Sequence, residues 1–144
     1  MPTERALTDE EHEEIQDAAM AALGRLGVEP DDATVLVEAI EARILARRSV
    51  RSDHNEEVYQ LGALFAHCLA ETLEWELVEV SWDTIVAHAV VTMDRSLAIL
   101  PFLAVARLYD VPSESAALAS SFARLLEGDR PPGLERGGYA VLLP

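Results

Sequence analysis

The sequence predicts an α+β fold in which N-terminal helices and a central buried helix pack on a short antiparallel β-meander, followed by C-terminal helices. Three observations predict this order. Apolar residues recur at helical spacing through the first half of the chain. β-branched and aromatic residues then dominate residues 75–100, and helical spacing returns after Pro101. At 144 residues the chain is expected to form a single domain, residues 1–144.

Composition and charge exclude several classes of protein. Hydrophobic residues make up 50% of the chain and charged residues 26%, which is typical of a folded protein. The net charge of −15 opposes nucleic-acid binding. All 11 basic residues are arginine, and the absence of lysine is typical of a GC-rich genome. Charges interrupt every apolar run before the ~20 residues of a membrane span, and the N-terminus is acidic. We therefore expect a cytoplasmic protein without membrane contact.

Capping residues and apolar periodicity indicate the first two helices. Residues 8–11, Thr-Asp-Glu-Glu, form a capping box, and Gly27 is expected to end the first helix. Acidic residues crowd its first turns, where the helix dipole favours them, and we interpret this run as a solvated face. Asp31 or Asp32 caps a second helix, whose apolar residues recur every three to four positions: Leu36, Ile40 and Ile44.

The strongest helical periodicity lies between about Asn55 and Glu74. Its apolar stripe comprises Val58, Leu61, Phe65, Cys68, Leu69 and Leu73. Ordering the backbone of such a helix costs ~20–40 kcal/mol, so the helix has to pack inside the domain. Gly62, Ala66 and Ala70 leave one flank without bulk, against which another backbone can come close.

Three strands are expected next. Trp75–Trp82 and Ile85–Met93 are rich in β-branched and aromatic residues, and Asp83-Thr84 between them suits a tight turn. Asp94-Arg95 gives a second turn before a short strand at Ser96–Leu100. A helix is the alternative for the apolar run 85–93. Both faces of the meander are partly apolar, so we expect the central helix on one face and other helices, or a second copy of the chain, on the other.

The C-terminal part is expected to be helical and then extended. Pro101 suits the first turn of a helix that carries Phe102, Val105 and Tyr109. A final helix is expected from Pro112 or Ser113 to Gly128. The proline- and glycine-rich residues that follow predict a flexible C-terminal tail, residues 129–144, with an apolar end.

Basic and aromatic residues supply the candidate binding surface. Four arginines between residues 43 and 51 are the one basic concentration in an acidic chain. They complement the end of the second helix and the acids of the first, or they contact an anion or a partner. The two tryptophans stand at strand ends, where they serve either ligand stacking or core and interface packing. The candidate partner-binding residues are Arg47, Arg48, Arg51, Trp75 and Trp82.

Catalytic motifs are absent from the sequence. It contains no phosphate loop, dinucleotide glycine fingerprint or nucleophile elbow. His67 and Glu71, four residues apart on the central helix, form half of a conceivable metal site, but no HExxH or second ligand pair accompanies them. We therefore assign no metal and no cofactor. The alternative function is a small hydrolase or metal-dependent enzyme that uses His67 and Glu71 with His54 or His88 brought near by the fold.

Four short segments carry a family resemblance: Leu61–Phe65, Trp75, Asp94–Ser96 and Ile99–Phe102. In these segments the chain resembles small bacterial domains of unknown function, some of which occur near toxin–immunity loci. The resemblance covers about residues 55–110. It implies no catalytic residues that can be transferred to this chain. We therefore favour a non-enzymatic protein–protein interaction or immunity-like module.

A homodimer is the last expectation. The meander is apolar on both faces, the small residues of the central helix leave a flank open, and the tail ends in an apolar segment. Isologous pairing of two copies satisfies all three observations. The charge of −15 opposes association, but salt screens it over roughly 8–10 Å.

Overall fold

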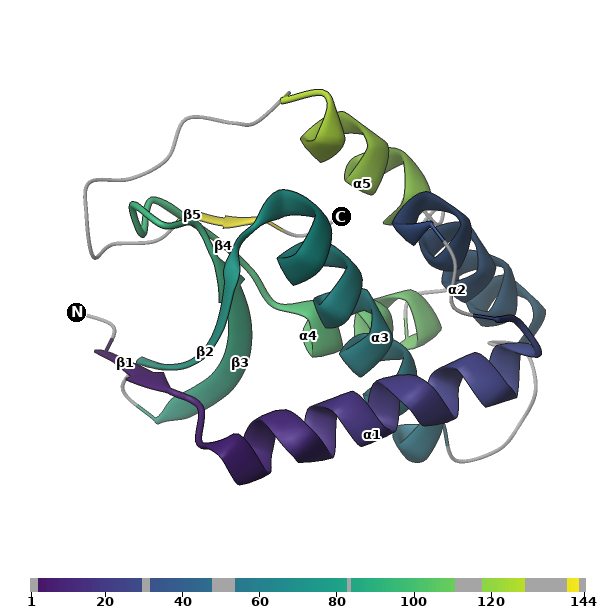
Figure 1. Cartoon of the computed structure of the whole chain (residues 1–144), viewed down its shortest axis with the longest axis horizontal. Helices are drawn as coiled ribbons and strands as arrows, with labels where there is room; N and C mark the ends of the chain where they lie inside the picture. Colours follow the sequence, from purple (N-terminus) through teal and green to yellow (C-terminus); the bar gives the residue numbers. More distant parts are fainter. Residues whose placement is uncertain are drawn as a thin grey trace.

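The computed structural model describes residues 3–29, 32–47, 54–82, 84–110, 118–128 and 140–142. Within these residues it contains helices and one sheet, which confirms the predicted α+β class (Figure 1). The helices are α1 (Asp9–Leu26), α2 (Ala33–Arg47), α3 (Asn55–Leu73), α4 (Pro101–Asp110) and α5 (Leu118–Leu126). The strands are β1 (Thr3–Ala6), β2 (Glu76–Trp82), β3 (Ile85–Val91), β4 (Leu97–Ile99) and β5 (Ala140–Leu142).

The sheet has the order β1-β2-β3-β4-β5, in which the first four strands pair antiparallel and β5 pairs parallel with β4. The predicted meander is therefore confirmed as β2, β3 and β4, and the helical alternative for residues 85–93 is wrong. Strand β1 was not predicted, because four exposed residues without apolar alternation carry no strand signal. It pairs along β2, with Arg5 opposite Glu79.

The first helix has the predicted ends. Thr8 accepts a hydrogen bond from the Glu11 amide, and the Glu11 carboxylate accepts one from the Thr8 amide, which completes the capping box. At the other end Gly27 adopts the left-handed conformation, with φ of 68°. These contacts fix where α1 begins and ends.

Helix α3 lies at the centre of the helical layer (Figure 1), as predicted. It packs against α1 along its length and against α4, while α5 packs on α2. Its buried side chains include Leu61, Leu64 and Leu69. Cys68 is buried among them, and burial raises the pKa of its thiol to about 12. The cysteine is a core residue.

The small-residue flank of α3 is occupied within the chain. A Cβ atom at Gly62 would lie 2.6 Å from Phe102 Cδ1, so glycine is what allows α4 to approach α3 so closely. Ala66 is fully buried. At Gly62 the flank is therefore filled by α4 of the same chain.

The two faces of the sheet have separate hydrophobic cores. Trp75, Val90 and Ile99 belong to the large core shared with the helices. A second cluster on the opposite face comprises Val78, Val80, Ala89, Val91, Ala98 and Leu100. The expected helical cover is not seen there, since this cluster contains no helical residue within the described parts of the chain. Its members are nevertheless buried in a single copy.

The C-terminal predictions lie partly outside the described residues. The final helix was expected from Pro112 or Ser113 to Gly128, and α5 occupies Leu118–Leu126. Residues 111–117 and most of the predicted tail fall outside the description. Its described part, Ala140–Leu142, is strand β5, so an apolar tail segment pairs within its own chain. No helix of the described residues is long and apolar enough to cross a membrane.

Candidate functional site

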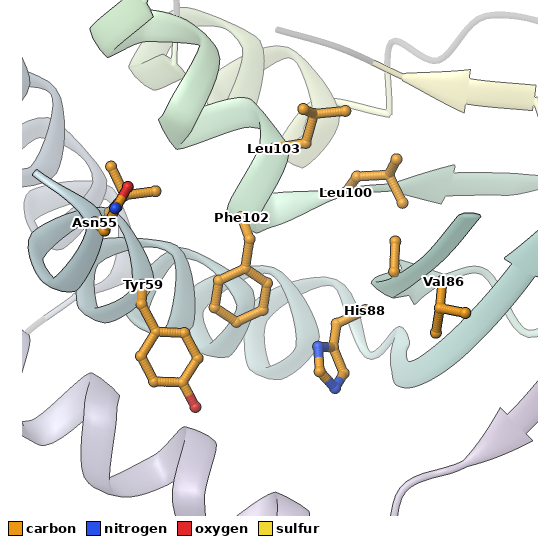
Figure 2. Close-up of a pocket in the computed structure, with 9 residues that line it drawn as sticks. Asn55, Tyr59, Val86, His88, Leu100, Phe102 and Leu103 are labelled. Carbon is orange, nitrogen blue, oxygen red and sulfur yellow. The ribbon is translucent and has the colours of Figure 1, made fainter. Parts of the chain in front are cut away.

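A shallow groove opens between the start of α3, the start of α4 and β3 (Figure 2). Its volume is about 320 Å³, within the range of about 300–1,000 Å³ that ligand sites occupy. The groove is lined by Asn55, Val58, Tyr59, Val86, Ala87, His88, Leu100, Phe102 and Leu103. Apolar side chains dominate this list, so the groove suits an apolar occupant.

Aromatic contacts fix the floor of the groove. Phe102 is held against α3 at Gly62, and its ring stacks on that of Tyr59 with centroids 5.4 Å apart and planes 16° apart. His88 meets the same phenylalanine at 5.7 Å in a tilted geometry. Figure 2 shows Phe102 between the tyrosine and the histidine. Three elements thus meet at one ring, which makes the floor a preformed surface.

The walls of the groove expose apolar area. Val86 is 62% exposed, Leu103 46% and Tyr59 41%. Ile85, the neighbour of Val86 on β3, is equally exposed but is not part of the groove lining. Apolar side chains that are this exposed and lie around one hollow are typical of interaction sites, whereas single exposed apolar residues are ordinary.

An acidic helix borders the groove. The hydroxyl of Tyr59 points towards α1 (Figure 2). Burial raises the pKa of this hydroxyl, and the negative charge of Glu14 on α1 raises it further. The charge of Glu14 thus acts on Tyr59. Glu14 is not itself one of the residues that line the groove.

The other end of the groove touches an ionic network. Arg5, Glu79 and His88 lie opposite one another on β1, β2 and β3. Arg5 donates hydrogen bonds to both Glu11 oxygens at 2.8 Å and to Glu79 Oε2 at 2.9 Å. The hydrogen bonds from Arg5 lower the pKa of Glu11 to about 2 and also lower the pKa of Glu79.

Glu11, Glu79 and His88 have potential metal-ligating atoms within 4.8 Å of one another, the one such trio among the described residues. Both carboxylates already accept hydrogen bonds from Arg5, however. Both Glu11 oxygens accept from Arg5, and one also accepts from the Thr8 amide. A cation would have to displace the arginine and break the cap of α1. The trio therefore fits a structural ion network better than a metal site.

A second hollow, of about 630 Å³, lies between α1, α3 and the start of β2. His67 and Glu71 both line it, as their spacing on one helix predicts, and His12 lines it from α1. The additional histidines expected for an enzyme are elsewhere. His54 stacks on Tyr109 with ring centroids 4.7 Å apart, and His88 lines the groove.

Of the predicted partner-binding residues, Trp75 and Arg47 are described, and neither lines the groove. Trp75 is 7% exposed and belongs to the main core, which is the packing alternative of the prediction. Arg47 lies 3.9 Å from Glu57 on α3. The acid near Arg47 thus belongs to α3, whereas the prediction paired the arginines with the acids of the first helix. Arg48, Arg51 and the side chain of Trp82 lie outside the described residues.

Sequence reasoning missed Tyr59, Val86, His88 and Leu103 as members of one surface. No sequence signal marks them, because the three segments that carry them meet only through tertiary packing. The spacing of Gly62 and the Pro101-Phe102 pair is the nearest hint, since it predicts close packing at this point.

Comparisons with known proteins give no assignment. No family model, no curated protein and no solved structure matches this chain.

Proposed function

We propose that the protein is a non-enzymatic protein-binding module and that the groove between α3, α4 and β3 is its binding surface. The observation that carries the proposal is the exposure of Val86, Leu103 and Tyr59 around a hollow with a fixed aromatic floor. Hot spots of protein interfaces are enriched in tyrosine, tryptophan and arginine, which suits Tyr59, and contiguous exposed apolar area such as that of Val86 and Leu103 marks interaction sites. The resemblance to domains found near toxin–immunity loci supports the same class, an immunity-like module that binds another protein.

The test compares two neighbouring residues of β3. Val86→Ser alters the groove, whereas Ile85→Ser removes an equally exposed side chain outside it. Tagged wild-type protein and both variants are incubated with an extract of the source cells, and a captured protein is then purified and titrated against each by calorimetry. The proposal expects wild type and Ile85→Ser to bind this protein alike and Val86→Ser to bind at least about tenfold more weakly. Equal binding by all three would exclude the groove.

A metal-dependent enzyme remains the second candidate, and the larger hollow favours it. His67, Glu71 and His12 line one cleft of a size suited to a small molecule. They are not among the residues whose potential ligand atoms converge within 4.8 Å. Elemental analysis of protein purified without chelator decides between the candidates. One equivalent of zinc that is lost in His67→Ala would support the enzyme and count against the binding module.

The homodimer also stays a prediction, although its three original grounds now have explanations within one chain. The clustered residues of the second sheet face are buried, Phe102 fills the flank of α3 at Gly62, and part of the tail pairs with β4. The exposed groove is then one apolar surface that a second copy can use. Light scattering coupled to gel filtration measures this directly. A mass of twice 15.7 kDa that falls to 15.7 kDa in Val86→Ser would identify the second copy as the groove's occupant.

A further inference from the structure

We infer that the occupant of the groove is a positively charged, amphipathic segment of a protein, with apolar side chains in the groove and an arginine or lysine over Tyr59 beside Glu14. This inference rests on the proposed function and specifies the chemistry of its partner. It is carried by the charge around the groove, by the state of the chain's own cations and by the geometry of the Tyr59 ring.

The helix that borders the groove exposes carboxylates. Asp9, Glu10, Glu13, Glu14 and Asp17 are all exposed on α1. None of them forms an ion pair with another described residue. One helix therefore carries several negative charges that the described part of the fold leaves uncompensated, and the charge of Glu14 acts on Tyr59 of the groove.

The positive charges of the sheet are already engaged. Arg5 is held by Glu11 and Glu79, and Arg95 is held by Glu4 and Glu76 at 2.8 and 2.6 Å. These two arginines give the sheet side of the groove little net positive potential. A cation from outside is what complements the α1 rim, and the whole-chain charge of −15 would attract it from a distance.

The aromatic floor supplies a second contact for the same cation. Stacking on Phe102 fixes the Tyr59 ring, yet 41% of this residue stays exposed. A guanidinium or ammonium group over the ring gains a cation–π interaction, and the negative charge of Glu14 acts on the same tyrosine. Apolar side chains of the same segment then reach Val86 and Leu103, at the other walls of the groove.

Charge also argues against the competing occupants. A second copy would bring another α1 face of the same sign towards this one, together with a further charge of −15. An anionic membrane surface would be repelled for the same reason. A basic, apolar protein segment has neither problem.

The experiment uses the full-length protein and a fluorescently labelled synthetic helix of about twelve residues, with leucines at helical spacing and arginines on their flanks. A matched peptide carries citrulline in place of every arginine, which keeps the shape and removes the charge. Fluorescence anisotropy measures Kd for both peptides. Glu14→Gln is compared with Glu38→Gln, which removes the same charge from an exposed position on α2, outside the groove.

The inference expects the arginine peptide to bind more tightly than the citrulline peptide. It also expects Glu14→Gln and Tyr59→Leu each to weaken the arginine peptide by about three- to fivefold, while Glu38→Gln changes its Kd by less than about twofold. No saturable binding, or equal losses for Glu14→Gln and Glu38→Gln, would overturn it. If the two peptides bind equally and Val86→Ser abolishes the binding of both, the groove is the binding surface but its partner is not basic. If the Val86→Ser and Ile85→Ser variants bind the peptide alike, the groove is not the binding surface.

Discussion

Two of the molecule's arginine–glutamate networks differ in burial, one being buried and the other exposed. In the first, Glu57 at the start of α3 is 4% exposed and accepts a 2.5 Å hydrogen bond from Arg43 on α2. In the second, Arg5 on β1 joins Glu11 on α1 to Glu79 on β2 at the surface. The side chains involved are similar, but their surroundings give the networks different energetic roles.

The two networks differ in their contribution to stability because one is buried and the other is exposed. Removing the Glu57 carboxylate from water costs free energy, and nearby nitrogens offset that cost. Arg43 donates a hydrogen bond to this carboxylate, and the nearest nitrogens of Arg47 and His54 lie 3.9 and 3.8 Å from it. The same environment raises the pKa of Tyr109 to about 12, through burial and then the negative charge of Glu57. The surface network gains less from its charges, because water and salt screen them, and its main effect is to fix where α1 begins.

The largest expected effect is on the buried network. Glu57→Ala leaves Arg43 and Arg47 facing each other without their carboxylate, so we expect the free energy of unfolding to fall by about 3 kcal/mol. Urea unfolding followed by circular dichroism measures this change. Glu56→Ala is the matched control, because it removes an exposed carboxylate from the same helical turn. Equal losses in both variants would mean that burial gives Glu57 no special role.

The two networks also differ in how far the sequence predicts them. The capping box of residues 8–11 is local, and its spacing alone identified the start of α1. The partner of Arg43 lies on the next helix, and only the packing of α2 on α3 brings it near. The sequence therefore revealed the concentration of arginines, but it did not predict the ion pair between Arg43 and Glu57 of α3.

The same division holds for the sheet and the groove. Residue pattern was enough for β2, β3 and β4, because β-branched runs and turn residues are local signals. Strand β1 depends on pairing with a segment more than seventy positions away, and the groove depends on side chains from α3, β3 and α4. Local residue patterns in a single sequence do not predict such contacts between distant segments.

A smaller effect is expected where the surface network meets the helix cap. Thr8→Ala removes the oxygen that accepts from the Glu11 amide, and we expect a loss of about 1 kcal/mol in the free energy of unfolding. Thr8→Ser keeps an oxygen at this position and should restore most of the loss. Both are measured by urea unfolding. A serine variant as unstable as the alanine variant would show that the threonine methyl group, and not the cap, matters.

The smallest expected effect is a pH dependence that isolates the Arg5–Glu11 pair. Hydrogen bonds from Arg5 and from the Thr8 amide lower the pKa of Glu11 from 4.5 to about 2 in the folded protein. A carboxyl whose pKa is lowered on folding stabilises the fold above its unfolded pKa, and this stabilisation is lost as the pH falls towards the folded value. The pair should therefore contribute fully near neutral pH and progressively less between pH 4.5 and about 2.

Glu11→Gln exposes this contribution, because glutamine does not titrate. The urea midpoint of the variant should lie below that of the wild type near neutral pH, and the difference should shrink as the pH falls from 4.5 towards 2. Asp94, whose pKa is lowered to about 2 by hydrogen bonds from Ser96 and Thr92, loses stability in the same range in both proteins, so it cancels from the difference. Glu10→Gln removes a charge from the same turn without touching Arg5 and corrects for the general effect of charge on α1. A difference that stays constant to the lowest pH would show that Glu11 acts through shape and polarity, with no contribution from its charge, and the surface network would then differ from the buried one in kind as well as in strength.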